Sequence, residues 1–164
     1  MSSIMMPFLT AIYGLIYLAK LQPGESVLIN SATGGVGLAA IQIAKMIGAE
    51  IFATVGTPEK KKFLMQEYGL QDDHVLSSKD ASFAAEIMQT TGGRGVDVSL
   101  NSLVREQLRA TWNCIGHHGR HIELGQTDIL DQGILDMSPF KRGASFIAMD
   151  LVLVFEHKPD LISQ

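Results

Sequence analysis

Apolar residues along this chain alternate between short continuous runs and longer stretches at helical spacing. The first short run, residues 27–29, leads into a glycine-rich turn, and apolar positions then recur at helical spacing from 38 to 49. A second short run follows at 50–55. Short apolar runs bounded by turn residues are typical of buried strands, and the longer period is typical of an amphipathic helix. The opening pattern therefore predicts strand, turn, helix and strand, with Gly48 ending the helix.

The same alternation continues along the rest of the chain. It predicts helices at 8–20, 58–68, 83–90 and 104–115, strands at 74–76, 96–100 and 120–124, and a final apolar segment, 145–154, that starts as a sixth strand. Strands that alternate with helices form parallel sheets with right-handed crossovers. We therefore expect an α/β protein with a doubly wound parallel sheet (a Rossmann fold) of about six strands and helices on both faces. The ligand crevice of such a sheet lies at the carboxyl ends of its strands.

The turn after the first strand carries the strongest chemical signal. Gly34 and Gly37 hold the second and third positions of a dinucleotide-binding G-x-G-x-x-G pattern, with alanine in the first. Glycine lets the backbone approach a pyrophosphate and lets the helix pack close to the strand, and the helix N-terminus attracts negative charge. The turn predicts a dinucleotide site, although an ordinary strand-to-helix turn rich in glycine is the alternative. The candidate cofactor-binding residues here are Ala32, Thr33, Gly34, Gly35, Val36 and Gly37.

The end of the second strand indicates which dinucleotide is bound. A site for NAD usually has an acidic residue there, about 20 residues past the turn, that binds the ribose hydroxyls. This chain instead has Gly56 and Thr57, followed by Pro58, Glu59 and three lysines. Thr57 can cap the helix that Pro58 begins, and Lys60 lies on its first turn, so together they form a cradle for a 2′-phosphate. We therefore expect NADPH as the cofactor, with the two lysines that follow on the solvent-exposed face of the helix.

Composition and charge exclude several classes of protein. A length of 164 residues fits one domain with a core of its own. The net charge of −4 and the pI near 5.7 argue against binding to nucleic acid or to an anionic membrane surface. Residues 4–19 carry no charge, but this stretch is shorter than the ~20 residues of a spanning helix and lacks the basic start of a signal peptide. A cytoplasmic protein with no membrane partner is expected.

Cysteine and histidine usage indicates no metal site. Cys114 is the one cysteine, which excludes an internal disulfide and a cysteine-cluster zinc site. His117, His118 and His121 are close in sequence, but their spacing fits no common metal motif. We expect these histidines to be ordinary loop or strand residues.

Five runs of the chain carry a resemblance to a known family. They are residues 27–42, 52–64, 74–83, 93–103 and 121–129, and they extend over nearly the whole chain. They resemble the nucleotide-binding half of a medium-chain dehydrogenase/reductase, specifically the enoyl reductase domain of a fungal highly reducing polyketide synthase. The resemblance implies NADPH-dependent reduction of an α,β-unsaturated thioester held on an acyl carrier protein. Hydride would pass to the β-carbon, and a proton would then reach the α-carbon.

The same resemblance implies where the cofactor lies. Residues 34–37 would follow the pyrophosphate and the nicotinamide, and Lys60 would contact the 2′-phosphate. The rest of the groove would be lined by Ser78, Asn101, Ser102 and Leu103.

Three positions near the implied reaction centre can be compared with the residues that related enoyl reductases have there. In related enoyl reductases the glycine after strand five is followed by a lysine, a proposed proton donor partnered by an aspartate at the end of strand six. Gln126 stands in place of that lysine, and Asp150 corresponds to the aspartate, so these two are the candidate catalytic residues. A neutral amide can orient substrate or water but cannot act as a general acid near neutral pH, so the enolate would take its proton from water. Asp150 has an alternative interpretation as a lone acid that faces solvent or caps a helix, and Arg105 stands where the family usually has glycine.

The resemblance also implies a domain organisation. A complete reductase of this kind has a barrel-like domain before the nucleotide-binding half, and that domain forms the other wall of the substrate cleft. We therefore expect residues 1–22 to be a linking helix from a missing N-terminal catalytic domain. Residues 23–164 would be the NADPH-binding Rossmann domain, truncated at its C-terminus. The isolated chain is expected to bind NADPH weakly and to have little or no activity, because a cleft without one wall cannot exclude water.

The apolar segment 146–155 bears on association. An exposed final strand of this kind pairs with another chain or risks aggregation, and in resembling enzymes it pairs with its counterpart, so a homodimer through the last strand is expected.

Two other functions stay open beside the enoyl reductase. One is a quinone or zeta-crystallin-like oxidoreductase that acts on a free small molecule, and the other is a non-catalytic nucleotide-binding domain.

Overall fold

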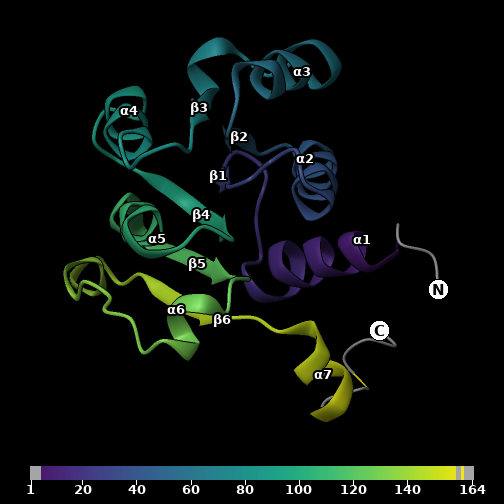
Figure 1. Ribbon diagram of the computed structural model, residues 1–164, viewed down its shortest axis with the longest axis vertical. Coiled ribbons are helices and arrows are strands. Elements are labelled where there is room, and N and C mark those ends of the chain that lie inside the picture. The colour runs from purple at the N-terminus through teal and green to yellow at the C-terminus, as the bar shows by residue number, and fades with distance from the viewer. Residues whose placement is uncertain (1–4, 158–159, 161–164) are drawn as a thin grey trace.

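The computed structural model describes residues 5–157 and residue 160. Its centre is a six-stranded sheet in which neighbouring strands run parallel, in the order β3-β2-β1-β4-β5-β6 (Figure 1). The order reverses between β1 and β4, as it does in a doubly wound fold, so the predicted Rossmann fold is confirmed. The strands are β1 Ser26–Ile29, β2 Glu50–Val55, β3 Val75–Ser77, β4 Val96–Asn101, β5 Ile115–Glu123 and β6 Ser145–Ala148.

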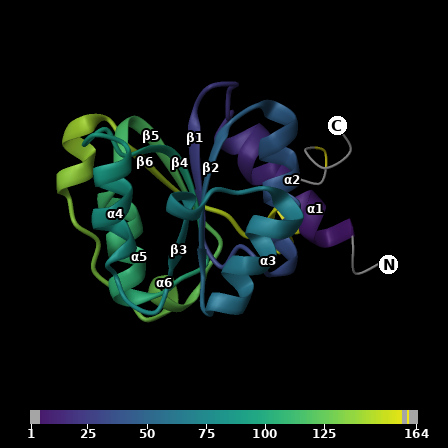
Figure 2. The same cartoon turned by 90° about the horizontal axis from the view of Figure 1, so that it is seen from above.

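Helices cover both faces of the sheet (Figure 2). On one side lie α1 Met5–Ile12, α2 Gly35–Ile47 and α3 Pro58–Tyr68, and on the other lie α4 Phe83–Thr90 and α5 Arg105–Asn113. Among the residues described, none of the helices has the length and apolar content that a membrane crossing requires. The shorter segments are α6 Thr127–Leu130, α7 Leu151–His157 and two 3₁₀ turns, Asp72–His74 and Ser138–Arg142.

Each face of the sheet has an apolar core of its own. On the side of α2, aliphatic residues such as Ile41 and Leu64 are fully buried. On the side of α5, the core contains the larger side chains of Phe52, Phe83 and Trp112. Burial of a side chain of this kind contributes roughly 1.5–3 kcal/mol. The two cores thus pack the helices onto the sheet, and because all neighbouring strands run parallel, their carboxyl ends lie at one edge.

The N-terminal segment is helical, as predicted, but its second half is a π-helix. The π-helical part is Tyr13–Leu18, and the N–H of Ala19 bonds to the carbonyl of Gly14 at 2.9 Å. A Cβ on Gly14 would lie 3.4 Å from Leu100 and 3.5 Å from Ile122. The helix therefore approaches the carboxyl ends of β4 and β5 closely at a residue that has no side chain.

β5 begins earlier than the sequence pattern predicts. Ile115 pairs with Val96, whereas Arg120 pairs with Val98, so residues 116–119 bulge out of the ladder. Glycines and exposed histidines in this bulge interrupt the apolar pattern. For that reason the pattern predicts the strand only from residue 120.

The final apolar segment is a strand only in its first part. β6 ends at Ala148, the N–H of Met149 bonds to the carbonyl of Glu123 at 2.9 Å, and α7 starts at Leu151. The prediction that segment 145–154 starts as a strand is therefore confirmed, but the expectation that 146–155 forms an exposed final strand is wrong beyond Ala148. A run that is apolar at nearly every position fits a helix as well as a strand. Asp150, which directly precedes α7, also has the charge that favours a helix N-terminus.

Candidate functional site

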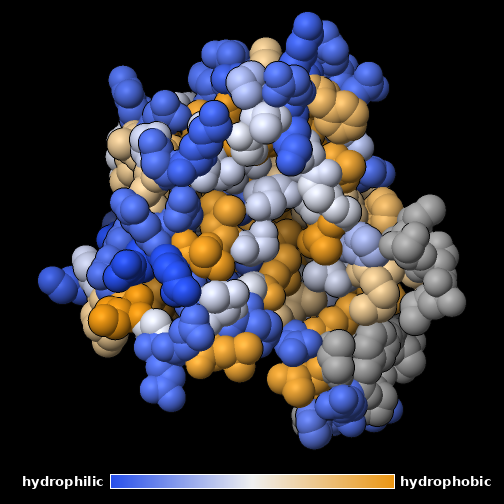
Figure 3. Space-filling view, viewed as in Figure 1, coloured by the Kyte–Doolittle hydropathy of each residue, from blue (hydrophilic) through white to orange (hydrophobic). Residues whose placement is uncertain are grey.

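A cleft of about 290 Å³ opens where the strand order reverses, at the carboxyl ends of the strands. Open α/β sheets bind their ligands at this position. Figure 3 shows one face of the molecule, on which apolar and near-neutral residues gather in the middle and hydrophilic residues cover α3 and α4. The cleft is lined by Asn30, Ser31, Gly34, Gly35, Val36, Gly37, Leu100, Ser102 and Leu124.

The glycine turn has the close backbone packing that its sequence predicts. A Cβ on Gly37 would lie 2.6 Å from both the Cα and the carbonyl oxygen of Ala32, so glycine alone fits there without a backbone shift. Ser31 takes the left-handed conformation, with φ of 53°, and accepts the N–H of Gly34 at 3.0 Å. Thr33 is half-buried inside the turn. The first turn of α2 lines the cleft, and because the first N–H groups of a helix lack intrahelical partners, this turn can hold an anion.

The start of α3 also forms as predicted. Thr57 is the N-cap residue, and its Oγ1 accepts the N–H of Lys60 at 3.2 Å. The side chains of Thr57 and Lys60 are both exposed just after β2. Lys61, expected on the exposed face, is instead half-buried and forms an ion pair with Asp72 at 3.0 Å, whereas Lys62 is exposed. That expectation is therefore wrong for Lys61, because the 3₁₀ turn before β3 brings a carboxylate to it.

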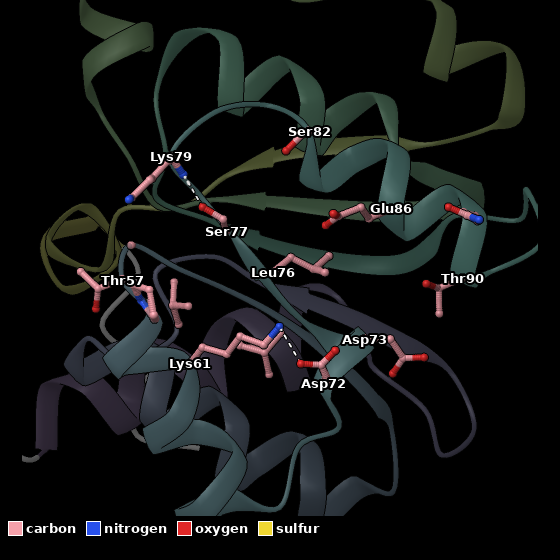
Figure 4. Close-up of a pocket in the computed structure, with 15 residues that line it drawn as sticks. Thr57, Lys61, Asp72, Asp73, Leu76, Ser77, Lys79, Ser82, Glu86 and Thr90 are labelled. Atoms are coloured by element: carbon pink, nitrogen blue, oxygen red, sulfur yellow. Dashed lines mark hydrogen bonds and ion pairs between the residues drawn. The ribbon is translucent and has the colours of Figure 1, made fainter.

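A larger hollow of about 510 Å³ lies between α3 and α4, beside the edge strand β3 (Figure 4). Thr57 and Lys79 lie at the same end of this hollow. The N–H of Lys79 donates to Ser77 Oγ at 3.2 Å, and the N–H of Ser78 donates to the carbonyl of Val55 at 2.9 Å. The sequence pattern places residues 77–80 at the ligand edge, but it singles out Ser78 alone and gives Ser77 and Lys79 no role of their own. Their signal was their position directly after a predicted strand whose end belongs to the ligand edge.

The residues at the end of β4 and directly after it differ in the burial of their side chains. The side chain of Asn101 is fully buried, and its amide nitrogen donates to Glu123 Oε1 at 2.9 Å. Ser102 is exposed and lines the cleft, and Leu103 is half-buried. The structure thus places the side chain of Asn101 beneath the cleft and Ser102 in its wall.

The two candidate catalytic residues follow neighbouring strands at the same edge. Gln126 is exposed directly before α6, and Asp150 is half-buried between β6 and α7. The bond from the N–H of Met149 to the carbonyl of Glu123 joins the ends of these two strands. The fold therefore puts both residues at the ligand edge, and their roles stay predictions.

Arg105, at the position where the resemblance leads us to expect glycine, has a backbone conformation that favours glycine. Its φ is 52°, in the left-handed region that favours glycine. Its N–H donates to Asp128 Oδ2 at 2.8 Å, and its guanidinium pairs with Asp131 at 3.3 Å. These contacts tie the start of α5 to α6 and support the unfavourable backbone angle.

Comparison with known proteins identifies the family. Residues 35–151 match the family described as zinc-binding dehydrogenase. The hybrid PKS-NRPS synthetase pynA of Aspergillus niger is 52% identical over 151 residues, which are 92% of this chain and 4% of that protein. The X-ray structure of the nucleotide-binding subdomain of the enoylreductase domain of PpsC from Mycobacterium tuberculosis is 40% identical, with a TM-score of 0.91, and the match covers 99% of this chain and 89% of that one. CurK enoyl reductase is 44% identical, with a TM-score of 0.84, over 96% of this chain and 46% of that one.

The chain therefore belongs to the zinc-binding dehydrogenase family. Within that family it is the nucleotide-binding half of an enoyl reductase domain of the fungal polyketide synthase kind, as the resemblance in its sequence indicated. It spans only 4% to 7% of the length of the curated synthases that it matches.

The family description names zinc, but the described residues do not fit a zinc site. They contain no group of three or more His, Cys, Asp or Glu side chains placed to hold a metal ion. His121 is buried, with its ring nitrogens 2.8 Å from Ser99 Oγ and Glu123 Oε1, and the other two histidines of the cluster are exposed in the bulge of β5. Burial raises the pKa of the Cys114 thiol to about 12, so it does not supply the thiolate that metal binding needs.

Proposed function

We propose that the chain binds NADPH in the cleft and serves as the cofactor-binding part of an enoyl reductase. The substrate is an α,β-unsaturated thioester held on an acyl carrier protein. The observation that carries this proposal is the glycine turn before α2. It places the N-terminus of this helix in the wall of the cleft, where the strand order reverses between β1 and β4. The likeness to enoyl reductases and to polyketide synthases supports the choice of substrate class.

The preference for NADPH over NADH rests on the residues after β2 and β3. No acidic residue directly follows β2 to bind the ribose hydroxyls, since Gly56 and the capping residue Thr57 stand there. Lys60, on the first turn of α3, and Lys79, in the loop after β3, are both exposed and follow two adjacent strands. Ammonium groups and the N–H groups of the first turn of α3 suit the two negative charges of a 2′-phosphate.

The chain's own residues orient the reactants and leave proton donation to solvent. Bound NADPH supplies the hydride for the β-carbon. The first turn of α2 would hold the pyrophosphate, and Ser102 and Leu124 line the same cleft. Gln126 can hydrogen-bond to substrate or water but has no acidic proton, so the α-carbon takes its proton from water. Asp150, at the end of the neighbouring strand, is the second candidate for orienting that water.

A non-catalytic nucleotide-binding domain is the second candidate function, and Gln126 is the observation that favours it. The test uses this chain within a complete reductase domain and follows NADPH oxidation with a crotonyl thioester and with a quinone. The proposal expects the thioester to be reduced much faster than the quinone. Faster reduction of the quinone would overturn the substrate class. NADPH binding without turnover of either would support the non-catalytic role.

Several expectations keep the status of predictions. The homodimer now rests on β6 alone, because α7 replaces the second half of the expected strand. The division at residue 22, the cytoplasmic location and the low activity of the isolated chain likewise stay predictions.

A further inference from the structure

Beneath the cleft, polar side chains on β2, β4 and β5 and directly after β1 form one continuous hydrogen-bonded set. Burying such groups is costly unless each finds a partner. No buried side-chain nitrogen or oxygen in the described part of the chain lacks one. We call this set the buried polar chain, and its members, all at most 4% exposed, are Thr54, Asn30, Asn101, Glu123, His121 and Ser99.

From Thr54 to Glu123, the hydrogen bonds of the buried polar chain run in one direction. Glu123 Oε1 accepts from Asn101 Nδ2 at 2.9 Å. Asn101 Oδ1 then accepts from Asn30 Nδ2 at 2.7 Å, and Asn30 Oδ1 accepts from the hydroxyl of Thr54 at 2.9 Å. If either amide turned over, like groups would face each other in an interior that has little water to relieve the conflict. The four residues from Thr54 to Glu123 therefore have one self-consistent arrangement of donors and acceptors.

Two members of the buried polar chain, Thr54 and Asn101, also hydrogen-bond to the backbone of the two loops at the cleft. Thr54 Oγ1 accepts the N–H of Ser31 at 3.3 Å. Asn101 brackets Leu103, accepting its N–H at 3.1 Å and donating to its carbonyl at 2.9 Å. Ser31 lines the cleft, and Leu103 directly follows Ser102, which also lines it. The loop after β1 and the loop after β4 are thus joined through Asn30 and Asn101.

Asn30 also has a branch that leads away from the cleft. Its Nδ2 donates to Thr111 Oγ1 on α5 at 2.9 Å, and Thr111 in turn donates to the carbonyl of Gln107 within the same helix. Thr54 and Thr111 are both fully buried, and each bonds to Asn30 at the same distance. Only Thr54 continues to a residue of the cleft.

We propose that Asn30, Thr54, Asn101 and Glu123 are positioning residues for the cofactor: they fix the spacing of the loops after β1 and β4 before the dinucleotide binds. This inference rests on the proposed function, since it concerns how the same cleft binds NADPH. A preformed site loses less freedom on binding, so loosening either loop weakens affinity even though none of the changed atoms need touch the ligand.

The two threonines provide a matched experiment. Thr54→Val and Thr111→Val each remove one buried hydroxyl and one hydrogen bond of the Asn30 side chain: the first takes the donor to Oδ1, and the second takes one of the two acceptors of Nδ2. Both are therefore expected to lower the thermal midpoint to a similar degree. Nicotinamide fluorescence measures the Kd for NADPH of each purified chain. We expect Thr54→Val to weaken binding by at least about fivefold and Thr111→Val by less than about twofold. Thr54→Ser, which keeps the hydroxyl, is expected to bind as the wild type does.

The outcomes separate this inference from the proposed function. Equal effects of the two valine substitutions on Kd, or no effect of either, would overturn the positioning role and leave only a contribution to stability. Loss of affinity in Thr54→Ser comparable to that in Thr54→Val would also overturn it, because the hydroxyl would then be irrelevant. If the wild-type chain itself bound no NADPH, the proposed function would fail, and the inference with it. Should Thr54→Val not fold, Thr54→Ser and Thr54→Ala at low temperature provide the same comparison.

Discussion

Gly37 and Ala32 lie in direct backbone contact, and this contact fixes the angle at which α2 leaves the first strand. A Cβ placed on Gly37 would come within 2.6 Å of two backbone atoms of Ala32, a separation that neither residue can relieve by turning a side chain. Because α2 lines the cleft with its first turn, the contact also decides where the N–H groups of that turn point.

We predict that Gly37→Ala destabilises the protein and weakens NADPH binding together. Alanine is intrinsically the better helix former, but overpacking against the backbone costs roughly 1–3 kcal/mol and outweighs that gain. Urea unfolding and NADPH titration measure the two effects. Gly56→Ala is the control for stability, since its added Cβ would meet no atom within 4 Å. Unchanged stability of Gly37→Ala would show that the turn can relax.

Lys60 and Lys79 should determine the preference between the two nicotinamide cofactors. We expect Lys60→Ala and Lys79→Ala each to weaken NADPH binding by about three- to tenfold, because an exposed ammonium near a phosphate contributes on the order of 1 kcal/mol. NADH binding should stay unchanged, since it has no 2′-phosphate. Lys62→Ala, also exposed on α3, is the matched control and should leave both constants as they are. Equal weakening of NADH and NADPH would contradict the assignment.

Gln126 should limit the rate of protonation in the complete reductase domain. Gln126→Lys introduces an acidic proton at the ligand edge, and a positioned general acid contributes about 10²–10⁴-fold to such a step. We therefore expect faster turnover of a crotonyl thioester, by roughly tenfold or more if protonation is slow, with the gain disappearing at high pH. Gln126→Met, which is similar in size but uncharged, should give no gain. A lysine variant no faster than wild type would mean that proton supply is not limiting.

Stability should fall in acid partly through Glu25. The hydrogen bond from Arg120 holds the pKa of this carboxyl below its usual value, against the opposing effect of burial, and the two guanidinium contacts measure 2.7 and 3.0 Å. A carboxyl with a lowered pKa in the folded state stabilises the protein above its unfolded pKa, near ~4.3, and the contribution is lost as pH falls through the folded pKa.

Glu25→Gln should therefore lose roughly 1–2 kcal/mol of unfolding free energy at pH 7. Urea titrations from pH 7 to 3 should show the difference from wild type shrinking toward zero at the acid end. A difference that stayed constant over this range would mean that Glu25 acts through packing rather than through charge.

Much of the fold follows from local patterns in the sequence. Gly48 and Gly69 end α2 and α3 in the left-handed conformation, with φ of 90° and 69°, and Thr57 caps α3 as its sequence position predicts. These features depend on neighbours within a few residues. The helix α7 could not be predicted in the same way, because apolar residues on both alternations do not distinguish a buried helix from a strand.

The sequence predicts which loops form the site. It does not predict the direction in which each side chain of those loops points. The sequence places Asn101 at the ligand edge, yet its side chain bonds inward to Asn30 and Glu123, from strands distant in the chain. Lys61 likewise looked exposed until the turn before β3 supplied Asp72. In both cases the residue that binds the side chain is brought to it by tertiary packing. The spacing of residues along the sequence carries no information about such partners.

Titration of the purified chain with NADPH and NADH, followed by nicotinamide fluorescence, tests the central claim most directly. The nucleotide-binding subdomain in the X-ray structure of PpsC has nearly the same extent as this chain, which favours the purified chain as the material for this titration. The account predicts saturable binding of NADPH, at least several-fold tighter than NADH and abolished or strongly weakened in Gly37→Ala. Equal affinity for the two cofactors would contradict the assignment of the 2′-phosphate site, and no saturable binding of either would contradict the cofactor site itself.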